Sequence, residues 1–219
     1  PAYAPCCGAG AERLIPGEPG SRLVCDPAAK ADLVLEGVLR QFDHVLSTAN
    51  ESFDRPDESP LTPAVLRSLH RSAVEGIYSC AGHYRDHGVR AGSHTPPERE
   101  AVPGLVEGMC DYVRERWEEQ DPVQLSAYVM WRVNWIHPFG GGNGRTSRAA
   151  SYLVLLARHG GLLPGEPIPA KLVAGHRAEY IAALRDADAA WAEAAVVDVT
   201  AMTDLLARLL SEQLGGGLQ

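Results

Sequence analysis

The chain has 219 residues, 45% of them hydrophobic, which is enough for one domain with a sizeable buried core. Its 20 Lys and Arg are outnumbered by 28 Asp and Glu, so the formal net charge is −8. A chain this acidic is a poor candidate for wrapping nucleic acid, whose phosphates require clustered cations. No stretch reaches the roughly 20 apolar residues of a membrane-spanning helix. We therefore expect neither nucleic acid nor a membrane as a partner.

The five cysteines, Cys6, Cys7, Cys25, Cys80 and Cys110, follow no recognisable disulfide or zinc-binding spacing. A metal ion held by the first three is the less favoured alternative, because they are loosely spaced. The start of the chain also lacks the basic and apolar segments of a secretory signal. These features predict a reducing, cytoplasmic setting.

In chain order, residues 1–27 are rich in proline and glycine and are expected to form an irregular arm. Residues 28–60 are expected to hold an N-terminal helix and a loop, because apolar residues recur at helical spacing and stop near Asn50. A second helix should begin at Thr62, a capping residue, followed by Pro63 at the first helical position.

After an irregular loop at residues 80–97, helical patterns continue to residue 214. They are predicted at residues 99–119, 121–136, 145–158, 169–186 and 190–214. The segment 121–136 is apolar on most sides, so it should run through the middle of the core. Residues 61–214 are therefore predicted to form the domain core and residues 215–219 a flexible tail. The expected fold class is all-α, a bundle around one central buried helix.

One segment between two of these helices concentrates residues suited to chemistry. It reads His137-Pro-Phe-Gly-Gly-Gly-Asn-Gly-Arg-Thr-Ser-Arg148. Glycine and asparagine tolerate positive φ, so backbone N–H groups can point into the turn. The next helix adds free amides and its positive dipole end, and Arg145 and Arg148 lie on neighbouring positions of one face. Together these groups predict a site for a multiply charged phosphate chain.

His137 stands at the rim of this predicted anion site. A neutral imidazole there can accept a proton from an attacking hydroxyl, as a general base must near neutral pH. The alternative is a histidine that caps a helix or fills core space, which is the better interpretation of a lone histidine. The turn and the arginines that follow favour catalysis.

His137-Pro138-Phe139, Gly142-Asn143-Gly144-Arg145 and Arg148 resemble the signature of the Fic family, HPFx(D/E)GNGRxxR. The resemblance extends to residues 61–70, to Ala81-Gly-His-Tyr-Arg85 and to Ala178–Leu184. It implies a Fic-type helical bundle and transfer of AMP from ATP, with Mg²⁺, to a Ser, Thr or Tyr hydroxyl of a target protein. It also implies a small β-hairpin flap that docks the target by strand pairing, formed by Val89, Arg90, Ala91, Gly92, Ser93 and His94.

By this resemblance His137 is the general base. The nucleotide and its phosphates would be held around Phe139, Gly140, Gly141, Gly142, Asn143, Gly144, Arg145 and Arg148. Tyr180 would lie near the adenine, with packing on an amphipathic helix as an equal alternative. Relatives of the death-on-curing toxin type, which phosphorylate their target, carry Lys at the position of Gly144. Glycine there favours nucleotidyl transfer.

The acidic position of the signature is Gly141 in this chain, so Mg²⁺ is expected but held less firmly. The ion would bind through phosphates and water, or a carboxylate such as Glu51 or Asp54 would reach in. Otherwise transfer would be slow or absent.

Ser47-Thr-Ala-Asn-Glu51-Ser52 resembles the inhibitory motif of the family, in which Glu51 would pair with Arg148 and block productive ATP binding. A solvated loop carboxylate is an equal alternative. The sequence thus predicts a protein adenylyltransferase restrained by Glu51. The alternatives are a nucleotide- or phosphate-binding regulatory module without catalysis, and a protein that removes AMP with Glu51 positioning a water.

Two further pairs of residues are assigned to structure. His83 and His87 are four apart but are predicted to be surface residues of a loop, not metal ligands. Trp131 and Trp135 are predicted to be core residues of the central helix, not a base-stacking platform.

Overall fold

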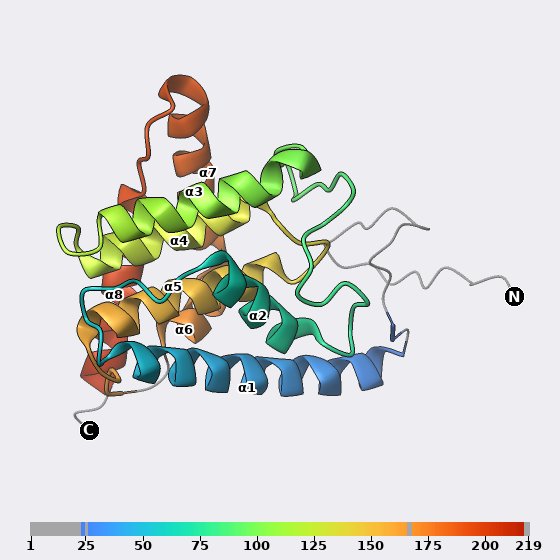
Figure 1. Cartoon of the computed structure of the whole chain (residues 1–219), viewed down its shortest axis with the longest axis horizontal. Helices are drawn as coiled ribbons and strands as arrows, with labels where there is room; N and C mark the ends of the chain where they lie inside the picture. Colours follow the sequence, from blue (N-terminus) through green and yellow to red (C-terminus); the bar gives the residue numbers. More distant parts are fainter. Residues whose placement is uncertain (1–22, 25, 166–167, 217–219) are drawn as a thin grey trace, which may run out of the picture.

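A computed structural model describes residues 23–24, 26–165 and 168–216, and the regular structure within these ranges is helical (Figure 1). The elements in chain order are α1 Pro27–Ser52, α2 Pro63–Val74, a 3₁₀ turn η1 Arg99–Ala101, α3 Val102–Glu115, α4 Pro122–Ile136, α5 Asn143–His159, α6 Pro169–Gly175, α7 Arg177–Ala194 and α8 Thr200–Gly216. The predicted all-α class is confirmed. The metal alternative at Cys6, Cys7 and Cys25 lies outside the described residues.

Three helices begin where a capping side chain precedes a proline. Asp26 accepts a hydrogen bond from a backbone N–H in the first turn of α1 at 2.9 Å, and Thr62 does the same for α2 at 3.2 Å. Asp121 accepts two such bonds at the start of α4, at 2.8 and 3.1 Å. These bonds satisfy N–H groups that have no partner inside the helix, and proline fits the first position because it has no N–H. The predicted start of the second helix at Thr62 and Pro63 is confirmed.

The helix α4 runs through the middle of the bundle and has α5 as its main neighbour. Most of its residues are buried, as the apolar sequence predicts. Inside the contact with α5, the hydroxyls of Ser126 and Ser151 lie 2.7 Å apart, and the Ser126 hydroxyl is 2.9 Å from the Ser151 carbonyl oxygen. Because α3, α7 and α8 also pack on α4, the helix is held from several sides.

The helices after α5 break at different places from those predicted. The helix expected over residues 169–186 is divided into α6 and α7 at His176, whose φ of −102° and ψ of 37° lie outside the helical region. The helix expected over residues 190–214 does not form as one element, because α7 continues to Ala194 and α8 begins at Thr200.

Trp191 gives the physical reason for the longer α7. Its ring centroid lies 6.1 Å from that of Trp131 and 5.9 Å from that of Trp135, both on α4. The Arg132 guanidinium lies 4.2 Å from the Trp135 ring centroid and 4.5 Å from that of Trp191. Trp131 is fully buried and donates its indole N–H to Asp188 at 2.9 Å. Trp131 is a core residue, as predicted, and Trp135 is partly buried and packs against the core.

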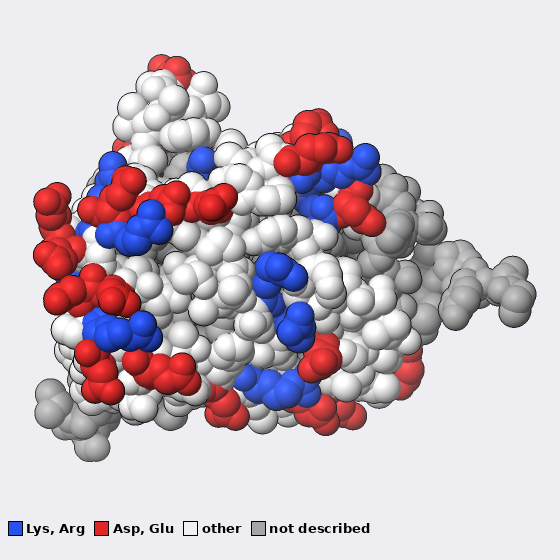
Figure 2. Space-filling model, viewed as in Figure 1, with Lys and Arg blue, Asp and Glu red and all other residues white. Residues whose placement is uncertain are grey.

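Charged side chains are mixed over the face shown in Figure 2, where small basic groups stand between acidic ones. The net charge of −8 is thus not concentrated in one acidic area of this face. In the part of the chain that the structure describes, no helix combines the length and apolar content needed to cross a membrane.

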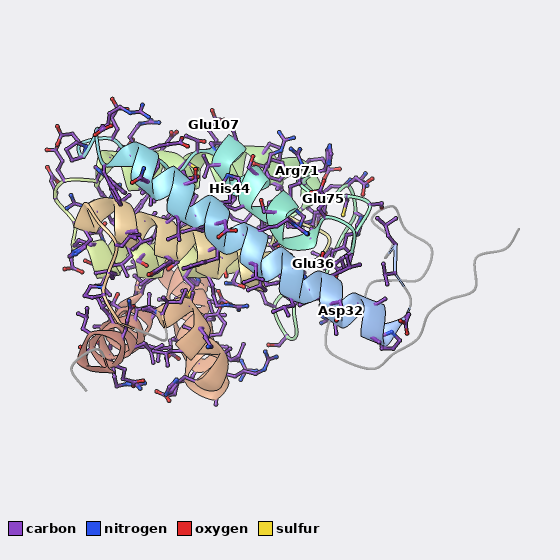
Figure 3. All side chains as sticks on the ribbon, turned by 90° about the horizontal axis from the view of Figure 1, so that it is seen from below. Asp32, Glu36, His44, Arg71, Glu75 and Glu107 are labelled. Carbon is purple, nitrogen blue, oxygen red and sulfur yellow. The ribbon has the colours of Figure 1, made fainter. Side chains whose placement is uncertain are left out.

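The long helix α1 lies along α2 and α5 on the outside of the bundle (Figures 1 and 3). Figure 3 shows His44 on α1 and Arg71 on α2, and the Nδ1 of His44 is 2.9 Å from the Ser72 hydroxyl of α2. Gly37 lets the two helices approach, because a Cβ there would lie 2.5 Å from the Ala73 carbonyl oxygen. Helix α2 is thus packed closely against α1 on one side, and its last residue, Val74, lies against Gly142 of the α4–α5 turn.

Candidate active site

The turn between α4 and α5, residues 137–142, is held in shape by the first residue of α5. The Asn143 side chain accepts the Phe139 N–H at 3.0 Å and donates to the Phe139 carbonyl at 2.9 Å. Both residues are fully buried. Asn143, expected to contact phosphate, therefore has both polar side-chain atoms engaged in forming the turn.

Gly142 ends the turn in a conformation that suits glycine. Its φ is +78°, and a Cβ there would lie 2.6 Å from a side-chain carbon of Val74. A side chain would be strained both by the backbone and by this contact. The close approach of the turn to α2 therefore depends on Gly142.

His70 on α2 holds the same turn from the other side. Its Nδ1 accepts the Gly82 N–H at 2.9 Å, and its Nε2 lies 2.9 Å from the Gly141 carbonyl oxygen, so the ring proton belongs on Nε2. The ring stacks on Phe139 with centroids 3.7 Å apart and planes within 1°. Burial lowers the pKa of His70 to about 4, so the imidazole is neutral near pH 7.

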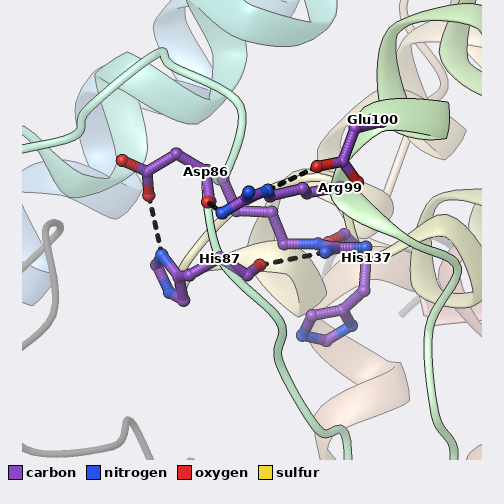
Figure 4. A network of polar contacts seen from close by, with 6 residues as sticks. Asp86, His87, Arg99, Glu100 and His137 are labelled. Carbon is purple, nitrogen blue, oxygen red and sulfur yellow. Dashed lines mark hydrogen bonds and ion pairs between the residues drawn. The ribbon is translucent and has the colours of Figure 1, made fainter.

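Arg85 joins the loop after α2 to the end of α4. This buried arginine donates from Nε to the His137 carbonyl oxygen at 2.8 Å and from Nη1 to that of His87 at 3.0 Å (Figure 4). A third bond reaches the Pro97 carbonyl, and the backbone N–H of Arg85 donates to the Pro138 carbonyl at 2.9 Å. Because these acceptors belong to two separate segments, one guanidinium fixes both around His137.

A chain of charged groups supports this loop (Figure 4). Asp86 accepts from the His87 Nδ1 at 2.8 Å, and Arg99 bonds to both the Asp86 carbonyl and the Glu100 carboxylate. The hydrogen bond from His87 holds the pKa of Asp86 below its usual value. His87 is buried whereas His83 is exposed, so the prediction of surface histidines is right for His83 and wrong for His87.

His137 has the geometry of a general base. It follows the last residue of α4 with φ 50° and ψ 57°, and its backbone N–H donates to the Val133 carbonyl at 2.9 Å. Its Nδ1 lies 3.3 Å from the Asn134 carbonyl oxygen, which can only accept, so Nδ1 carries the proton. The Nε2 then has a lone pair, has no hydrogen-bond partner among the described residues and is not sealed in the interior. Burial lowers the pKa of His137 to about 4, which keeps the ring neutral.

Arg145 and Arg148 lie on the first turns of α5. Arg145 donates to the Ala73 carbonyl oxygen at 2.9 Å and so ties α5 to the end of α2. Arg148 lies beside Tyr180, whose pKa is raised by burial and lowered again in part by that arginine. A Cβ on Gly144 would meet only the Arg148 guanidinium, at 3.4 Å, so no bulky neighbour crowds this residue of the first turn. Two arginines together with the N-terminus of α5 can hold a multiply charged anion.

Tyr180 supports these groups from within the bundle. Its side chain is 6% exposed, and its hydroxyl is 2.8 Å from the Asn134 amide nitrogen. The same nitrogen is 2.8 Å from the Ser147 hydroxyl and 2.7 Å from the Met130 carbonyl. The structure matches the packing alternative for Tyr180, and contact with adenine stays a prediction.

Gly141 faces the ring of Tyr78. A Cβ at position 141 would lie 3.0 Å from Cζ of that ring and 3.2 Å from Cε2 and from the hydroxyl oxygen. Tyr78 is 5% exposed, so the ring occupies the space into which an acidic side chain at position 141 would extend. The nearest carboxylate described, that of Asp86, is bonded to His87, and the other groups around the turn are amides, guanidinium groups and the neutral imidazoles of His70 and His137, which are not anionic ligands for a hard cation. The described residues therefore do not fit a magnesium ion held by the protein.

The predicted flap is a tight turn with one bridged pair, and not two strands. The Ala91 N–H donates to the His94 carbonyl at 3.1 Å, and the His94 N–H returns the bond at 3.0 Å, around Gly92 with φ +62°. The His94 ring attaches this turn to the core, because its Nε2 lies 2.8 Å from the Trp135 carbonyl oxygen. Its Nδ1 lies 3.7 Å from the Asp188 carboxylate. Docking of a target by residues 89–94 stays a prediction.

Ser47 and Glu51 lie on the last turns of α1, far from the α4–α5 turn. The Ser47 hydroxyl donates to the exposed Glu51 carboxylate at 3.2 Å. Phe42 stacks on Tyr152 with centroids 6.5 Å apart, and α1 and α5 run in the same direction (Figure 1). Relative to this pair, Glu51 lies nine residues toward the C-terminus of α1, whereas Arg148 lies four residues toward the N-terminus of α5. At about 1.5 Å per residue this separates them by roughly 20 Å, so the expected ion pair is not formed.

Asp54 lies at the same end as Glu51. Nearby, the Pro56 carbonyl accepts the indole N–H of Trp117 at 2.8 Å, and Arg158 from the end of α5 lies 5.5 Å from the Trp117 ring centroid. The alternative in which Glu51 or Asp54 reaches the phosphates is therefore wrong. The motif at residues 47–52 does not reveal how long the helix that contains it is. In the structure α1 continues to Ser52, the last residue of that motif.

Sequence reasoning assigned no role at the turn to His70, Tyr78 or Arg85. His70 and Arg85 lie within the segments that carry the family resemblance, which is the signal that could have found them. Tyr78 has no local signal, because its contact with Gly141 depends on how α2 and α5 pack.

Comparison with known proteins gives the family. The Fic/DOC family profile matches residues 60–155. A Fido domain-containing protein of Dictyostelium discoideum is 33% identical over 119 residues, which are 52% of this chain and 77% of that protein. The Protein adenylyltransferase Fic of Nematostella vectensis is 28% identical over 117 residues, which are 52% of this chain and 27% of that protein. The chain belongs to the Fic/DOC family.

Solved structures agree on the fold. The crystal structure of a Fic domain containing signaling protein from Bacteroides thetaiotaomicron has a TM-score of 0.65 at 23% sequence identity, covering 81% of this chain and 70% of that one. The helical arrangement is thus that of Fic proteins. The chain spans about a quarter of the length of the Nematostella relative.

Proposed function

We propose that this chain is a protein adenylyltransferase that transfers AMP from ATP to a Ser, Thr or Tyr hydroxyl of a target protein. The observation that carries the proposal is the neutral His137, whose Nε2 is unpartnered among the described residues at the rim of an anion site. The relatives named as protein adenylyltransferases support the same activity.

In the proposed reaction the target hydroxyl oxygen forms a bond to the α-phosphorus of ATP. The bond from that phosphorus to the bridging oxygen breaks, pyrophosphate leaves, and Nε2 of His137 takes the hydroxyl proton. Arg145, Arg148 and the N-terminus of α5 offset the charge that develops on the phosphates. Magnesium that accompanies ATP would be held by the phosphates and water, because Gly141 offers no ligand.

The target would approach over residues 89–94, next to His137. A backbone segment of the target can pair with the edge of this turn and so present its hydroxyl to the imidazole. We also propose a cytoplasmic setting, supported by the free thiols of Cys80 and Cys110.

The test is transfer of label from ATP labelled on the α-phosphate to protein, with wild type and His137→Ala side by side. We expect His137→Ala to lose at least ~100-fold in rate, the range of a general base, while binding of a fluorescent ATP analogue stays within twofold. His159→Ala is the matched control, because His159 is exposed at the far end of α5. Label that does not depend on His137 would overturn the proposed mechanism.

A second candidate is a nucleotide-binding regulatory module without transfer, and the contact between Gly141 and Tyr78 favours it. Nucleotide binding with no label on any protein would select this module. Removal of AMP with a water positioned by Glu51 is not proposed, since Glu51 lies at the opposite end of the bundle from His137.

A further inference from the structure

We infer that Tyr78 fills the place of the missing acidic side chain at position 141, so that this site binds nucleotide without a metal ion held by the protein. The inference rests on the proposed function for the identity of the ligand. Its structural part, the complementary sizes of the residues at positions 78 and 141, can be tested without any ligand.

The steric argument begins with the backbone. The φ of Gly141 lies outside the left-handed region, whereas that of Gly142 is +78°. The main chain at position 141 would therefore accept a side chain, and the three atoms nearest to its Cβ position all belong to Tyr78. With ring atoms 3.0 to 3.2 Å from the Cβ position, even alanine requires the ring to move, and aspartate requires it to leave.

Neither side of this contact can yield easily. Tyr78 packs in a cluster with Ala73, Val74 and Ile77, all three fully buried, and its N–H is bonded to the Val74 carbonyl at 3.1 Å. On the other side, the carbonyl of Gly141 lies 2.9 Å from the buried His70 ring. The tyrosine and the glycine are thus fitted to one another from two rigid elements.

The charges around the site also favour nucleotide binding without a metal ion held by the protein. Arg145 and Arg148 supply two positive charges, and the N-terminus of α5 adds its partial positive charge. His70 and His137 are neutral near pH 7, because burial lowers the pKa of each to about 4. With no carboxylate at position 141 to repel the phosphates, the nucleotide needs no bridging cation there. We expect the Kd of a nonhydrolysable ATP analogue to change less than about threefold between EDTA and Mg²⁺.

The decisive experiment follows Mn²⁺ binding by electron paramagnetic resonance in the presence of that ATP analogue. The proteins are wild type, Gly141→Asp, the double variant Tyr78→Ala with Gly141→Asp, and the double variant Tyr78→Phe with Gly141→Asp as matched control. Only the alanine double variant should hold Mn²⁺ at least about tenfold more tightly than the analogue alone does, because only there can the new carboxylate reach the phosphates. The phenylalanine control keeps the ring and should gain nothing. Tight Mn²⁺ binding by wild type or by Gly141→Asp alone would overturn the inference.

A thermal unfolding series covers the case in which a variant is damaged. Gly141→Ala should lower Tm by about 4 °C or more in the wild-type background, but by less than half of that beside Tyr78→Ala, where the ring is absent. Equal losses in both backgrounds would overturn the steric part. If only the proposed function is wrong, no label appears on protein, but Gly141→Ala still lowers Tm more in the wild-type background than beside Tyr78→Ala.

Discussion

The Nε of Arg85 donates a hydrogen bond to the carbonyl oxygen of His137 at 2.8 Å. The acceptor belongs to a residue with φ 50°, a conformation that non-glycine residues adopt only when their surroundings hold them there. Arg85 is 4% exposed and also bonds to the carbonyl of His87 at 3.0 Å. The main chain of the proposed base is thus positioned by a side chain from a distant loop.

Arg85→Lys should separate positioning from binding. An ammonium cannot reproduce the planar fork that bonds to several carbonyls, so we expect kcat to fall at least ~10-fold while KM for ATP stays within twofold. Steady-state transfer kinetics measure both constants. Arg99→Lys is the control, because Arg99 is exposed and bonds to the same loop without touching His137. A rise in KM with unchanged kcat would contradict the positioning role.

The pH dependence of transfer should reflect the lowered pKa of His137. A general base works in its neutral form, and with a pKa of about 4 that form is present throughout the range from pH 5 to 8. We expect kcat/KM to be flat between pH 5 and 7 as far as His137 is concerned. A loss centred near pH 6.5, the value of an unperturbed histidine, would show that the imidazole titrates in solvent.

Stability should fall on acidification because of His70. Its pKa is about 4 in the folded protein and about 6.5 for an unperturbed histidine, so the unfolded chain binds more protons between these values. Stability from His70 is complete above pH 6.5 and is lost as the pH falls toward 4. Urea unfolding at pH 7.5 and 5 should show a loss on the order of 2 kcal/mol from this residue.

The variant His70→Gln tests this assignment, because glutamine does not titrate. Its free energy of unfolding should be lower at pH 7.5 but should change less on going to pH 5 than that of wild type. His137 contributes with the same sign, so some pH dependence remains. An unchanged slope would mean that the buried ring is not the titrating group.

Two glycines separated by one residue, Gly142 and Gly144, should respond differently to replacement by alanine. At Gly142 a methyl group meets both a positive φ and a Val74 side-chain carbon 2.6 Å away, so the variant should lose about 2–3 kcal/mol of stability. Gly144 lies in the first turn of α5, where a Cβ meets only Arg148 at 3.4 Å, and alanine there should be neutral within about 1 kcal/mol. Chemical unfolding of the pair, each serving as control for the other, decides this.

Replacement of Glu51 should leave transfer unaffected. Its carboxylate is exposed and bonds to Ser47 on the same helix, roughly 20 Å along the bundle from Arg148. We expect Glu51→Ala to label protein within twofold of the wild-type rate, whereas Arg148→Ala should weaken ATP binding. A many-fold gain for Glu51→Ala would mean that α1 occupies a second position in solution.

The elements most accurately predicted from the sequence are those decided by neighbouring residues. The start of α2 follows from Thr62 and Pro63, and the turn before α5 follows from a short run of glycines. The breaks in the C-terminal helices depend on Trp191 packing against α4, a contact between residues far apart in the chain. Local periodicity contains no information on such contacts.

The same distinction applies to the site. His137 and Arg145 could be proposed as site residues because one short signature contains both. Tyr78 could not be connected with Gly141, because that relationship depends on how α2 lies against the α4–α5 turn. The ion pair expected between Glu51 and Arg148 was wrong because a short local pattern was used to predict a contact between distant residues.

Asn143 closes the α4–α5 turn by bonding both backbone groups of Phe139, and His70 stacks on the same ring. The amides of the turn are therefore aligned in the absence of nucleotide, and binding requires little loss of chain entropy at this point. Association should then be limited by diffusion and by attraction between the polyphosphate and the arginines, and should slow as salt is added. The lifetime of the complex with a ligand would depend on how many phosphates that ligand carries. Under the proposed function, pyrophosphate and the adenylylated target carry different numbers of phosphates and would therefore leave at independent rates.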